Sequence, residues 1–349
     1  MNEALEKWFL ELPKADLHCH LDGSLRLETL IDLAQKQDIP LPSYSPEVLK
    51  RQLKLGMPCE NLADYLRVFS TTLSVLQEAA SLERVAFELA EDAHQENIRY
   101  LEVRYSPALH TEGGMRLEEA VEAVLRGLRR ANQKYGIAFG VIVCTLRHFP
   151  LKTSLELAEV AGAFWGKGVV AFDLAGGEAQ FPGAPHKLAF EKAAELGLFV
   201  TVHAGEAAGA DSVREALYAL KAQRLGHGVR LVEDAALEKE VLENRIPLEC
   251  CPTSNVQTTA VAKLAAHPLK RFVRQGMCAT LNTDNRLVSD TTLSKEYACA
   301  YFEMGMTISE LCTVARHGFE AAFMEEAPKK QMLAQVDEAL QKMRMSKFS

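Results

Sequence analysis

Eight short apolar segments constrain the fold of this chain more than any other feature. Each is rich in residues that favour β-strands, and each is followed by a longer stretch in which apolar residues recur with helical periodicity. Because these segments are apolar on both faces and alternate with helices, they predict a parallel sheet covered by helices. The expected strands are 15–20, 100–105, 139–145, 169–174, 198–203, 224–228, 247–251 and 278–282.

The number of units favours a closed (β/α)8 barrel of the TIM type over an open doubly wound sheet. An open sheet would have fewer strands and a glycine-rich phosphate-binding turn after the first strand. No such turn follows strand 15–20. About eighty residues separate the first two strands, too many for one crossover, so we expect a helical lid at about 23–95. With no linker, charge block or internal repeat, we expect one domain over residues 1–349.

The composition indicates which binding partners and which cellular compartment to expect. The chain has 39 basic and 47 acidic residues and a net charge of −8, which argues against binding to nucleic acid. Its eight cysteines are scattered, several within apolar runs, as expected for reduced thiols in a protein core. Neither a secretory signal pattern nor an apolar stretch of membrane-spanning length is present. We therefore expect a cytoplasmic protein with no membrane contact and no obligate protein partner.

Polar side chains gather at the ends of four expected strands. His18 and His20 are two residues apart on a strand, so both point to the same side. His203 ends the fifth strand, His227 lies on the sixth, and Asp284 follows the eighth. In a barrel the carboxyl ends of the strands form the rim where active sites are built. An isolated His-x-His pair is more often structural, but the coincidence of four strands favours a site.

Neutral imidazoles with one carboxylate suit Zn²⁺ or a similar divalent ion, whereas Mg²⁺ or Ca²⁺ would need more oxygen ligands. Such an ion lowers the pKa of water toward neutrality. Glu206 follows His203 by three residues, and Gly205 permits a tight turn between them. We expect Glu206 to face the site as a proton-transferring acid rather than to cap the next helix. The remaining histidines (94, 110, 148, 186, 267 and 317) are assigned no role.

Seven motifs in order along the chain resemble the adenosine deaminase family of the metal-dependent amidohydrolases. They are Leu17-His18-Cys19-His20-Leu21-Asp22-Gly23-Ser24, Val103-Arg104-Tyr105-Ser106-Pro107, Asp173-Leu174-Ala175-Gly176, His203-Ala204-Gly205-Glu206, Gly226-His227-Gly228, Cys251-Pro252-Thr253-Ser254-Asn255 and Leu281-Asn282-Thr283-Asp284. The resemblance runs from near residue 13 to past residue 300. It implies a zinc-dependent enzyme of purine salvage that converts adenosine and 2′-deoxyadenosine to inosine and 2′-deoxyinosine plus ammonia.

The resemblance also implies a role for each matching residue. One zinc ion would be held by four residues: His18, His20, His203 and Asp284. Glu206 would protonate purine N1 so that C6 accepts the attacking hydroxide. His227 would orient that hydroxide and stabilise the developing charge, and Asp284 would also accept its proton. The fourth strand lacks the lysine that binuclear amidohydrolases carbamylate, which favours a single ion.

Substrate contacts follow from the same resemblance. The backbone N–H of Gly176 would donate to purine N3, Asp22 would bind the ribose hydroxyls, and His20 would join these contacts. A hydrophobic gate would come from four residues with the i, i+3, i+4, i+7 spacing of one helical face. These residues are Leu62, Tyr65, Leu66 and Phe69, for each of which ordinary core packing is an equally good interpretation.

Two positions depart from the common pattern of the family. Asn285 stands where relatives have a second aspartate that is thought to contact purine N7. Since N7 only accepts, an aspartate must be protonated to donate to it, whereas the Asn285 amide donates at any pH. We expect the contact to persist with a relaxed pH dependence. Gly177 replaces an acid found in many relatives and is expected to loosen the turn that presents Gly176.

Two alternatives remain open. One is a related purine deaminase acting on adenine, aminodeoxyfutalosine or an N6-substituted adenine nucleotide. A nucleotide would need a phosphate-binding cluster, for which Arg26, Lys54 and Arg67 are too ordinary. The other is a catalytically silent relative that only binds nucleosides, although every expected metal and proton-transfer position is filled.

Overall fold

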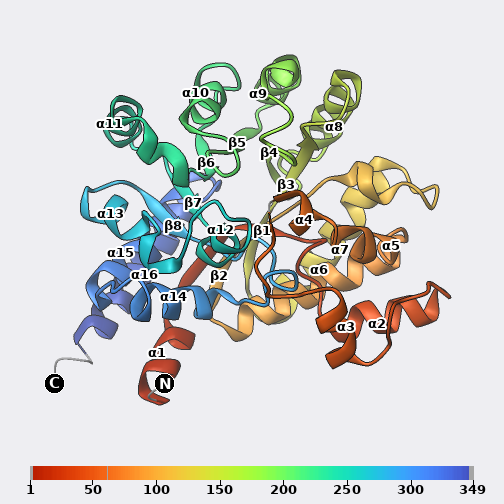
Figure 1. The fold of residues 1–349 in the computed structure, drawn as a ribbon, viewed down its shortest axis with the longest axis horizontal. Helices are drawn as coiled ribbons and strands as arrows, with labels where there is room; N and C mark the ends of the chain where they lie inside the picture. The colour runs from red at the N-terminus through yellow and green to blue at the C-terminus, as the bar shows by residue number, and fades with distance from the viewer. Residues whose placement is uncertain (1–2, 61, 346–349) are drawn as a thin grey trace.

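Eight parallel strands form a single ring in chain order in the computed structural model, which describes residues 3–60 and 62–345. Helices alternate with the strands and surround them (Figure 1). The (β/α)8 barrel of the TIM type predicted from the sequence is thus confirmed. The strands are β1 (Lys14–His20), β2 (Ile98–Tyr105), β3 (Ala138–Leu146), β4 (Val169–Ala175), β5 (Phe199–Ala204), β6 (Arg224–His227), β7 (Leu248–Cys250) and β8 (Ala279–Leu281).

The ladder between neighbouring strands is uneven around the ring. Six residue pairs join β2 to β3, but only Ala171–Phe199 and Phe172–Val200 join β4 to β5. The ring closes between β8 and β1 through backbone bonds of Asp284, whose N–H donates to His18 O at 2.7 Å and whose carbonyl accepts from His20 N–H at 2.7 Å. The residues expected to bind metal from the two ends of the chain are therefore joined by their own backbones.

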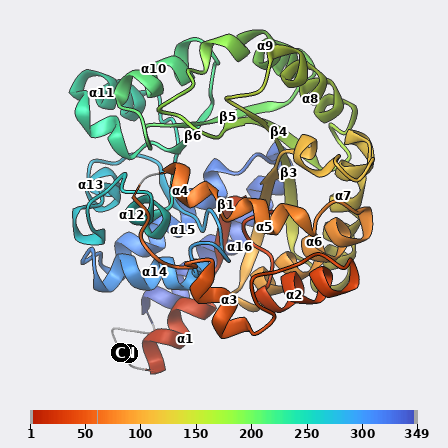
Figure 2. The same ribbon diagram turned by 45° about the vertical axis from the view of Figure 1, so that its right-hand side comes forward.

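An outer ring of helices covers the strands (Figure 2). In α7, Ala120, Val121, Val124 and Leu128 lie on one buried face, which follows from their helical spacing. A side chain at Gly127 would collide with backbone of the preceding helix, so glycine permits the close packing of α6 on α7. The helices are α6 (Ala79–Gln95), α7 (Leu117–Tyr135), α8 (Leu151–Ala163), α9 (Lys187–Glu195), α10 (Ala210–Tyr218), α11 (Ala235–Glu243), α13 (Leu269–Arg274), α14 (Leu293–Phe302), α15 (Ile308–Ala321) and α16 (Glu326–Met345), with α1 (Glu3–Glu11) before β1.

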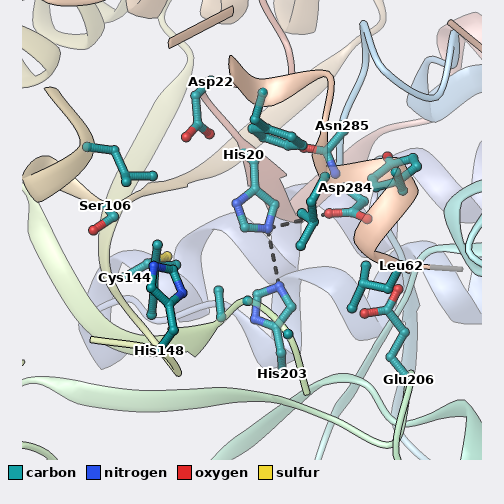
Figure 3. A pocket seen from close by; sticks show the side chains of 18 of the residues that line it. His20, Asp22, Leu62, Ser106, Cys144, His148, His203, Glu206, Asp284 and Asn285 are labelled. Atoms are coloured by element: carbon teal, nitrogen blue, oxygen red, sulfur yellow. Dashed lines mark hydrogen bonds and ion pairs between the residues drawn. The ribbon is translucent and has the colours of Figure 1, made fainter. Parts of the chain in front are cut away.

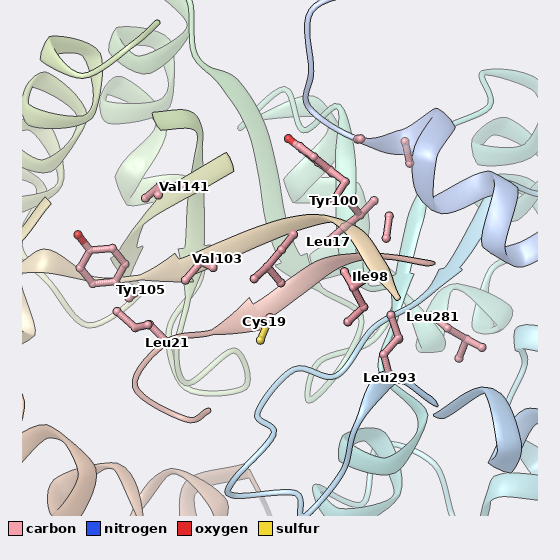
Figure 4. Packing of buried hydrophobic residues seen from close by; sticks show 14 of the residues in the cluster. Leu17, Cys19, Leu21, Ile98, Tyr100, Val103, Tyr105, Val141, Leu281 and Leu293 are labelled. Carbon is pink, nitrogen blue, oxygen red and sulfur yellow. The ribbon is translucent and has the colours of Figure 1, made fainter. Parts of the chain in front are cut away.

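Alternation along β1 separates the core from the site. Leu17 and Cys19 pack outward with Val103 of β2 in the main apolar cluster (Figure 4). Asp16 and His18, on the opposite face of the strand, are fully buried in the barrel interior. The two-residue period of a strand therefore gives one face to packing and the other to chemistry.

Between β1 and β2 lie α2 (Leu27–Lys36), α3 (Pro46–Gln52), α4 (Leu62–Leu66), α5 (Phe69–Ser74) and α6. Of these, α6 packs against α7 and β2 as part of the outer ring. We call α4 and α5 the lid helices, since their side chains reach the cavity described below.

The four apolar residues expected on one helical face come from two helices, so the prediction of a single helix is wrong. The helix breaks at Arg67 and Val68, where the N–H of Thr71 bonds to Val68 O at 3.0 Å in the tighter i+3 pattern. The segment 68–72 contains Val, Ser and two Thr, which have lower helix propensity than Ala or Leu and favour this break.

Over the described residues, the structure contains no helix that combines the length and the apolar character needed to cross a lipid bilayer.

Candidate active site

A cavity of about 240 Å³ lies at the carboxyl ends of the strands, below the lid helices (Figure 3). Most of the residues selected from the sequence line it: His20, Asp22, Leu62, Tyr65, Leu66, Phe69, Gly176, His203, Glu206, His227, Asp284 and Asn285. His18 is the exception and lies fully buried beside this group. The lining also includes Ser106, Leu109, Cys144, Leu146, His148, Ala175 and Gly177, which were not predicted.

Four potential ligand atoms converge at one end of the cavity. One atom each from His18, His20, His203 and Asp284 lies within 4.8 Å of the other three. The two Nε2 atoms of His20 and His203 are 3.2 Å apart, and Asp284 Oδ1 is 3.4 Å from Nε2 of both His18 and His20. His18 Nε2 is buried without a hydrogen-bond partner among the described residues. Such a convergent set of three nitrogens and one oxygen fits a divalent transition-metal ion.

Carboxylates behind the imidazoles fix their orientation. His18 Nδ1 is 2.7 Å from Glu249 Oε2, and His203 Nδ1 is 3.0 Å from Asp173 Oδ2. A carboxylate at Nδ1 holds the proton there and leaves the Nε2 lone pair free for a metal. Burial lowers the pKa of His18 to about 4, so this imidazole is neutral near pH 7, as a ligand must be.

These carboxylates belong to a buried charge network of five residues: Glu102, Arg104, Asp173, Arg224 and Glu249. All five side chains are fully buried. Arg104 bonds to Asp173 at 3.1 Å and to Glu249 at 2.7 Å, while Arg224 pairs with Glu249 and Glu102. Although burial opposes its ionisation, Glu249 has a pKa well below the usual value because Arg104 and Arg224 face it. The network keeps negative charge behind His18 and His203.

Glu206 lies on the bend that follows β5 and is 5% exposed. Its Oε1 accepts a hydrogen bond from Thr258 Oγ1 at 3.1 Å, and its Oε2 is 3.5 Å from His227 Nε2. Burial raises the pKa of this carboxyl group, so it retains a proton at higher pH than an exposed glutamate. A carboxylic acid in this state suits proton donation to a bound substrate.

A chain of hydrogen bonds sets the tautomer of His227. The Leu269 N–H donates to His267 Nδ1 at 3.1 Å, so the His267 proton is on Nε2 and is donated to Asn255 Oδ1 at 3.1 Å. The Asn255 amide N–H₂ then donates to His227 Nδ1 at 3.0 Å. His227 therefore carries its proton on Nε2, facing the cavity as a donor.

Two rim residues have strained backbones. His227 and Asp284 adopt positive φ angles of 62° and 60°, which non-glycine residues rarely do. Ser254 Oγ donates to Asp284 Oδ2 at 2.5 Å and so fixes the carboxylate whose other oxygen faces the histidines.

Two polar groups in the cavity lining have no internal partner within the described part of the chain. Asp22 Oδ1 and Asn285 Oδ1 are both buried without a hydrogen bond. Burial raises the pKa of Asp22 to about 7. Asn285 packs over Gly23, where any side chain would collide with its amide. Buried polar groups without partners are expected where a ligand supplies the missing bonds.

Comparison with known proteins identifies the family. The adenosine deaminase family model matches residues 13–339. The chain belongs to the adenosine deaminase family. An adenosine deaminase from Clostridium acetobutylicum is 40% identical over 335 residues, which cover 95% of this chain and 99% of that relative.

Two solved structures of deaminases named for other purine substrates share the fold. An adenine deaminase from Arthrobacter aurescens aligns with a TM-score of 0.88 at 27% identity, covering 95% of this chain and 99% of that one. An N6-mAMP deaminase from Arabidopsis aligns with a TM-score of 0.85 at 27% identity, with the same coverage of both chains.

Several residues with clear contacts in this adenosine deaminase site were given no role from the sequence. Glu249 and Asp173 orient imidazoles, Ser254 holds Asp284, and Thr258 holds Glu206. His267, set aside among the unassigned histidines, fixes Asn255 and through it His227. A signal for the first two was available, since a charged residue within an apolar strand, such as Glu249 between Leu248 and Cys250, needs a buried partner.

Proposed function

We propose that this member of the family catalyses the zinc-dependent hydrolytic deamination of adenosine and 2′-deoxyadenosine. The products are inosine or 2′-deoxyinosine and ammonia. The observation that carries the proposal is that four potential ligand atoms converge at the cavity that also holds the buried Glu206, whose pKa burial raises. A small-molecule purine is the substrate class common to the relatives.

One zinc ion is proposed at His18, His20, His203 and Asp284. The donor set supports this ion, because three imidazole nitrogens and one carboxylate match zinc better than a hard cation that needs more oxygen ligands. When bound, the ion makes water acidic enough to attack near neutral pH.

The residues around the metal site move and hold protons. Glu206 gives a proton to purine N1, which draws electron density from C6 and prepares it for attack by water. His227 presents its Nε2–H to the attacking oxygen, and Asp284 accepts the proton that water loses. Asp284 passes that proton to the exocyclic nitrogen, the C6–N bond breaks and ammonia leaves, and the proton of the new C6 hydroxyl returns to Glu206 as the carbonyl forms.

Other residues bind the purine and the sugar. Gly176 has a φ of 95°, a conformation that favours glycine, and its backbone N–H is proposed to donate to purine N3. The Asn285 amide is proposed to bind N7, while Asp22, together with His20, binds the sugar. Leu62, Tyr65, Leu66 and Phe69 line the cavity from the lid helices and exclude water from the bound base.

The cavity favours a nucleoside over a nucleotide. Its lining, as far as the described residues go, has neither a lysine nor an arginine, while a phosphate dianion would need such cations. Asp22 would also repel the phosphate when ionised. Free adenine is disfavoured for a different reason, because without ribose the buried Asp22 carboxyl would stay unpartnered. These points favour a nucleoside over the substrates for which the adenine and N6-mAMP deaminases of the same fold are named.

A substrate panel tests the proposal. Adenosine, 2′-deoxyadenosine, adenine, AMP and N6-methyl-AMP are each followed by the ultraviolet change that accompanies deamination. The two nucleosides are expected to have the highest kcat/KM. A higher kcat/KM for adenine or a nucleotide would assign the chain to the other branch, and binding of adenosine without turnover of any compound would support a silent relative. The cytoplasmic location expected from the sequence stays a prediction.

A further inference from the structure

Glu178 lies outside the cavity lining, yet its carboxylate is surrounded by the backbone that carries Glu206. Glu178 Oε1 accepts the N–H of Gly205 at 2.6 Å. Glu178 Oε2 accepts the N–H groups of Glu206, Ala207 and Ala208 at 3.0, 2.6 and 2.9 Å. The residue is 5% exposed. One side chain therefore binds four consecutive backbone donors, which wrap around it as a backbone nest wraps an anion.

This contact lies where the ladder between neighbouring strands is short. Only two residue pairs join β4 to β5, and both lie well before the ends of these strands. Beyond them, side chains from β4, from the segment after β4 and from Arg147, which follows β3, contact the end of β5 and its bend. Asp173 bonds to His203, Arg147 donates to His203 O at 2.7 Å, and Glu178 binds the bend after β5. The bend is held from both sides: on the β6 side by backbone bonds from the N–H groups of Gly228 and Arg230 to the carbonyls of Ala204 and Gly205, and on the β4 side by side chains.

The 205–208 bend carries Glu206, the proposed proton donor. Gly205 has a φ of 68°, and a side chain there would meet Val213 Cγ2 at 2.7 Å, so the turn is tight. The N–H of Glu206 is itself one of the four donors. Only the far end of the Glu206 side chain has separate contacts, to Thr258 and His227. Loss of the Glu178 carboxylate would remove the partner of the Glu206 N–H, at the residue proposed to deliver the proton.

We propose that Glu178 is a positioning residue for the deamination reaction, which holds the 205–208 bend and thereby places the Glu206 carboxyl group against the substrate. The inference rests on the proposed function, in which Glu206 is the proton donor. It gives a role to the acid two residues after Gly176, and it predicts an effect on kcat rather than on substrate binding, because Glu178 does not line the cavity.

The test compares Glu178→Gln with a matched control. Glutamine keeps the size but turns one acceptor oxygen into a donor that faces N–H groups. We expect kcat with adenosine to fall about 10²-fold, as for a misplaced catalytic group, with KM within about twofold of the parent. Glu215→Gln is the control, because Glu215 also accepts two backbone N–H groups, from Gly183 and Ala184, in a loop without a proposed site residue. Its kcat is expected to stay within about twofold of the parent.

A double-mutant cycle separates positioning from general structure. In a Glu206→Gln background, Glu178→Gln is expected to change kcat by less than about twofold, since the acid being positioned is already gone. An equal loss in both backgrounds, or an unchanged kcat in folded Glu178→Gln, would overturn the inference. If that variant does not fold, Glu178→Asp replaces it in the same cycle, with melting temperature and metal content measured throughout. Unchanged turnover in Glu206→Gln alone would instead overturn the proton-donor role and leave Glu178 without its stated purpose.

Discussion

The two walls of the cavity are built in different ways. One wall, which we call the strand wall, consists of residues at or just after the strand ends, such as His20, His203, Glu206, Asp284 and Asn285. Behind it, fully buried groups form ionic and hydrogen-bonded contacts, such as His18 with Glu249 and Arg104 with Asp173. The lid wall consists of two short helices whose leucines and phenylalanine are only half-buried. A bond of 2.7 Å between Tyr65 Oη and Ser289 Oγ ties it to the loop after β8.

Because of this difference, we expect the two walls to contribute differently to catalysis and to substrate binding. Charged groups without water must be paired, so a change in the strand wall disturbs both stability and the metal site. The lid wall is proposed to contribute apolar surface over the base. Chemistry should therefore depend on the strand wall, and substrate affinity should depend on the lid.

The largest effect is expected at the proton donor of the strand wall. Glu206→Gln keeps size and hydrogen bonding but removes the transferable proton, so kcat should fall about 10²- to 10⁴-fold. Metal content, measured by atomic emission, should equal that of the parent. An unchanged kcat would remove Glu206 from the mechanism.

The second-largest effect is expected from Glu249, which lies behind the proposed metal site and contacts His18. Glu249→Gln leaves Arg104 and Arg224 short of a buried counter-charge, and we expect a loss of about 3–5 kcal/mol in the free energy of unfolding. Because Glu249 also orients His18, metal affinity should fall about 10- to 100-fold. Denaturant unfolding and metal titration measure the two effects. The exposed Glu243→Gln is the control, and equal behaviour of the two variants would refute the coupling of network and metal site.

A smaller effect is expected where the strand wall contacts the purine ring. Asn285→Asp replaces a donor by a carboxylate, which accepts but cannot donate to N7 until it is protonated. We expect kcat/KM to fall about tenfold near neutral pH, the value of one lost hydrogen bond. The ratio of variant to parent should rise as the pH is lowered, because protonation restores a donor. A ratio that does not change with pH would contradict the proposed N7 contact.

The smallest effect is expected in the lid wall. Phe69→Ala should raise KM for adenosine several-fold, about 1 kcal/mol of lost apolar contact, while kcat stays within about twofold. The melting temperature should change little, since Phe69 is only partly buried. A loss of kcat comparable to that of Glu206→Gln would show that the lid takes part in the chemistry and would break the distinction between the walls.

The sequence predicted the strand wall better than the lid. Apolar runs located all eight strands, and since parallel strands end at one rim, His18, His203 and Asp284 could be brought together without coordinates. The hydrogen-bond partners of these residues could not be predicted, because nothing in a strand pattern indicates which buried acid faces which imidazole. The contacts of Glu178 with the 205–208 bend could not be predicted either, because they join residues 27 to 30 positions apart in the chain. The break between α4 and α5 was missed because apolar spacing continues across it.

The position of the metal ion tests the central claim most directly. Crystals of the protein supplied with zinc should be measured at the zinc absorption edge for anomalous scattering. The account predicts a single peak per chain, within bonding distance of His18, His20, His203 and Asp284. No peak among these four residues, or a second ion of equal occupancy beside the first, would contradict it.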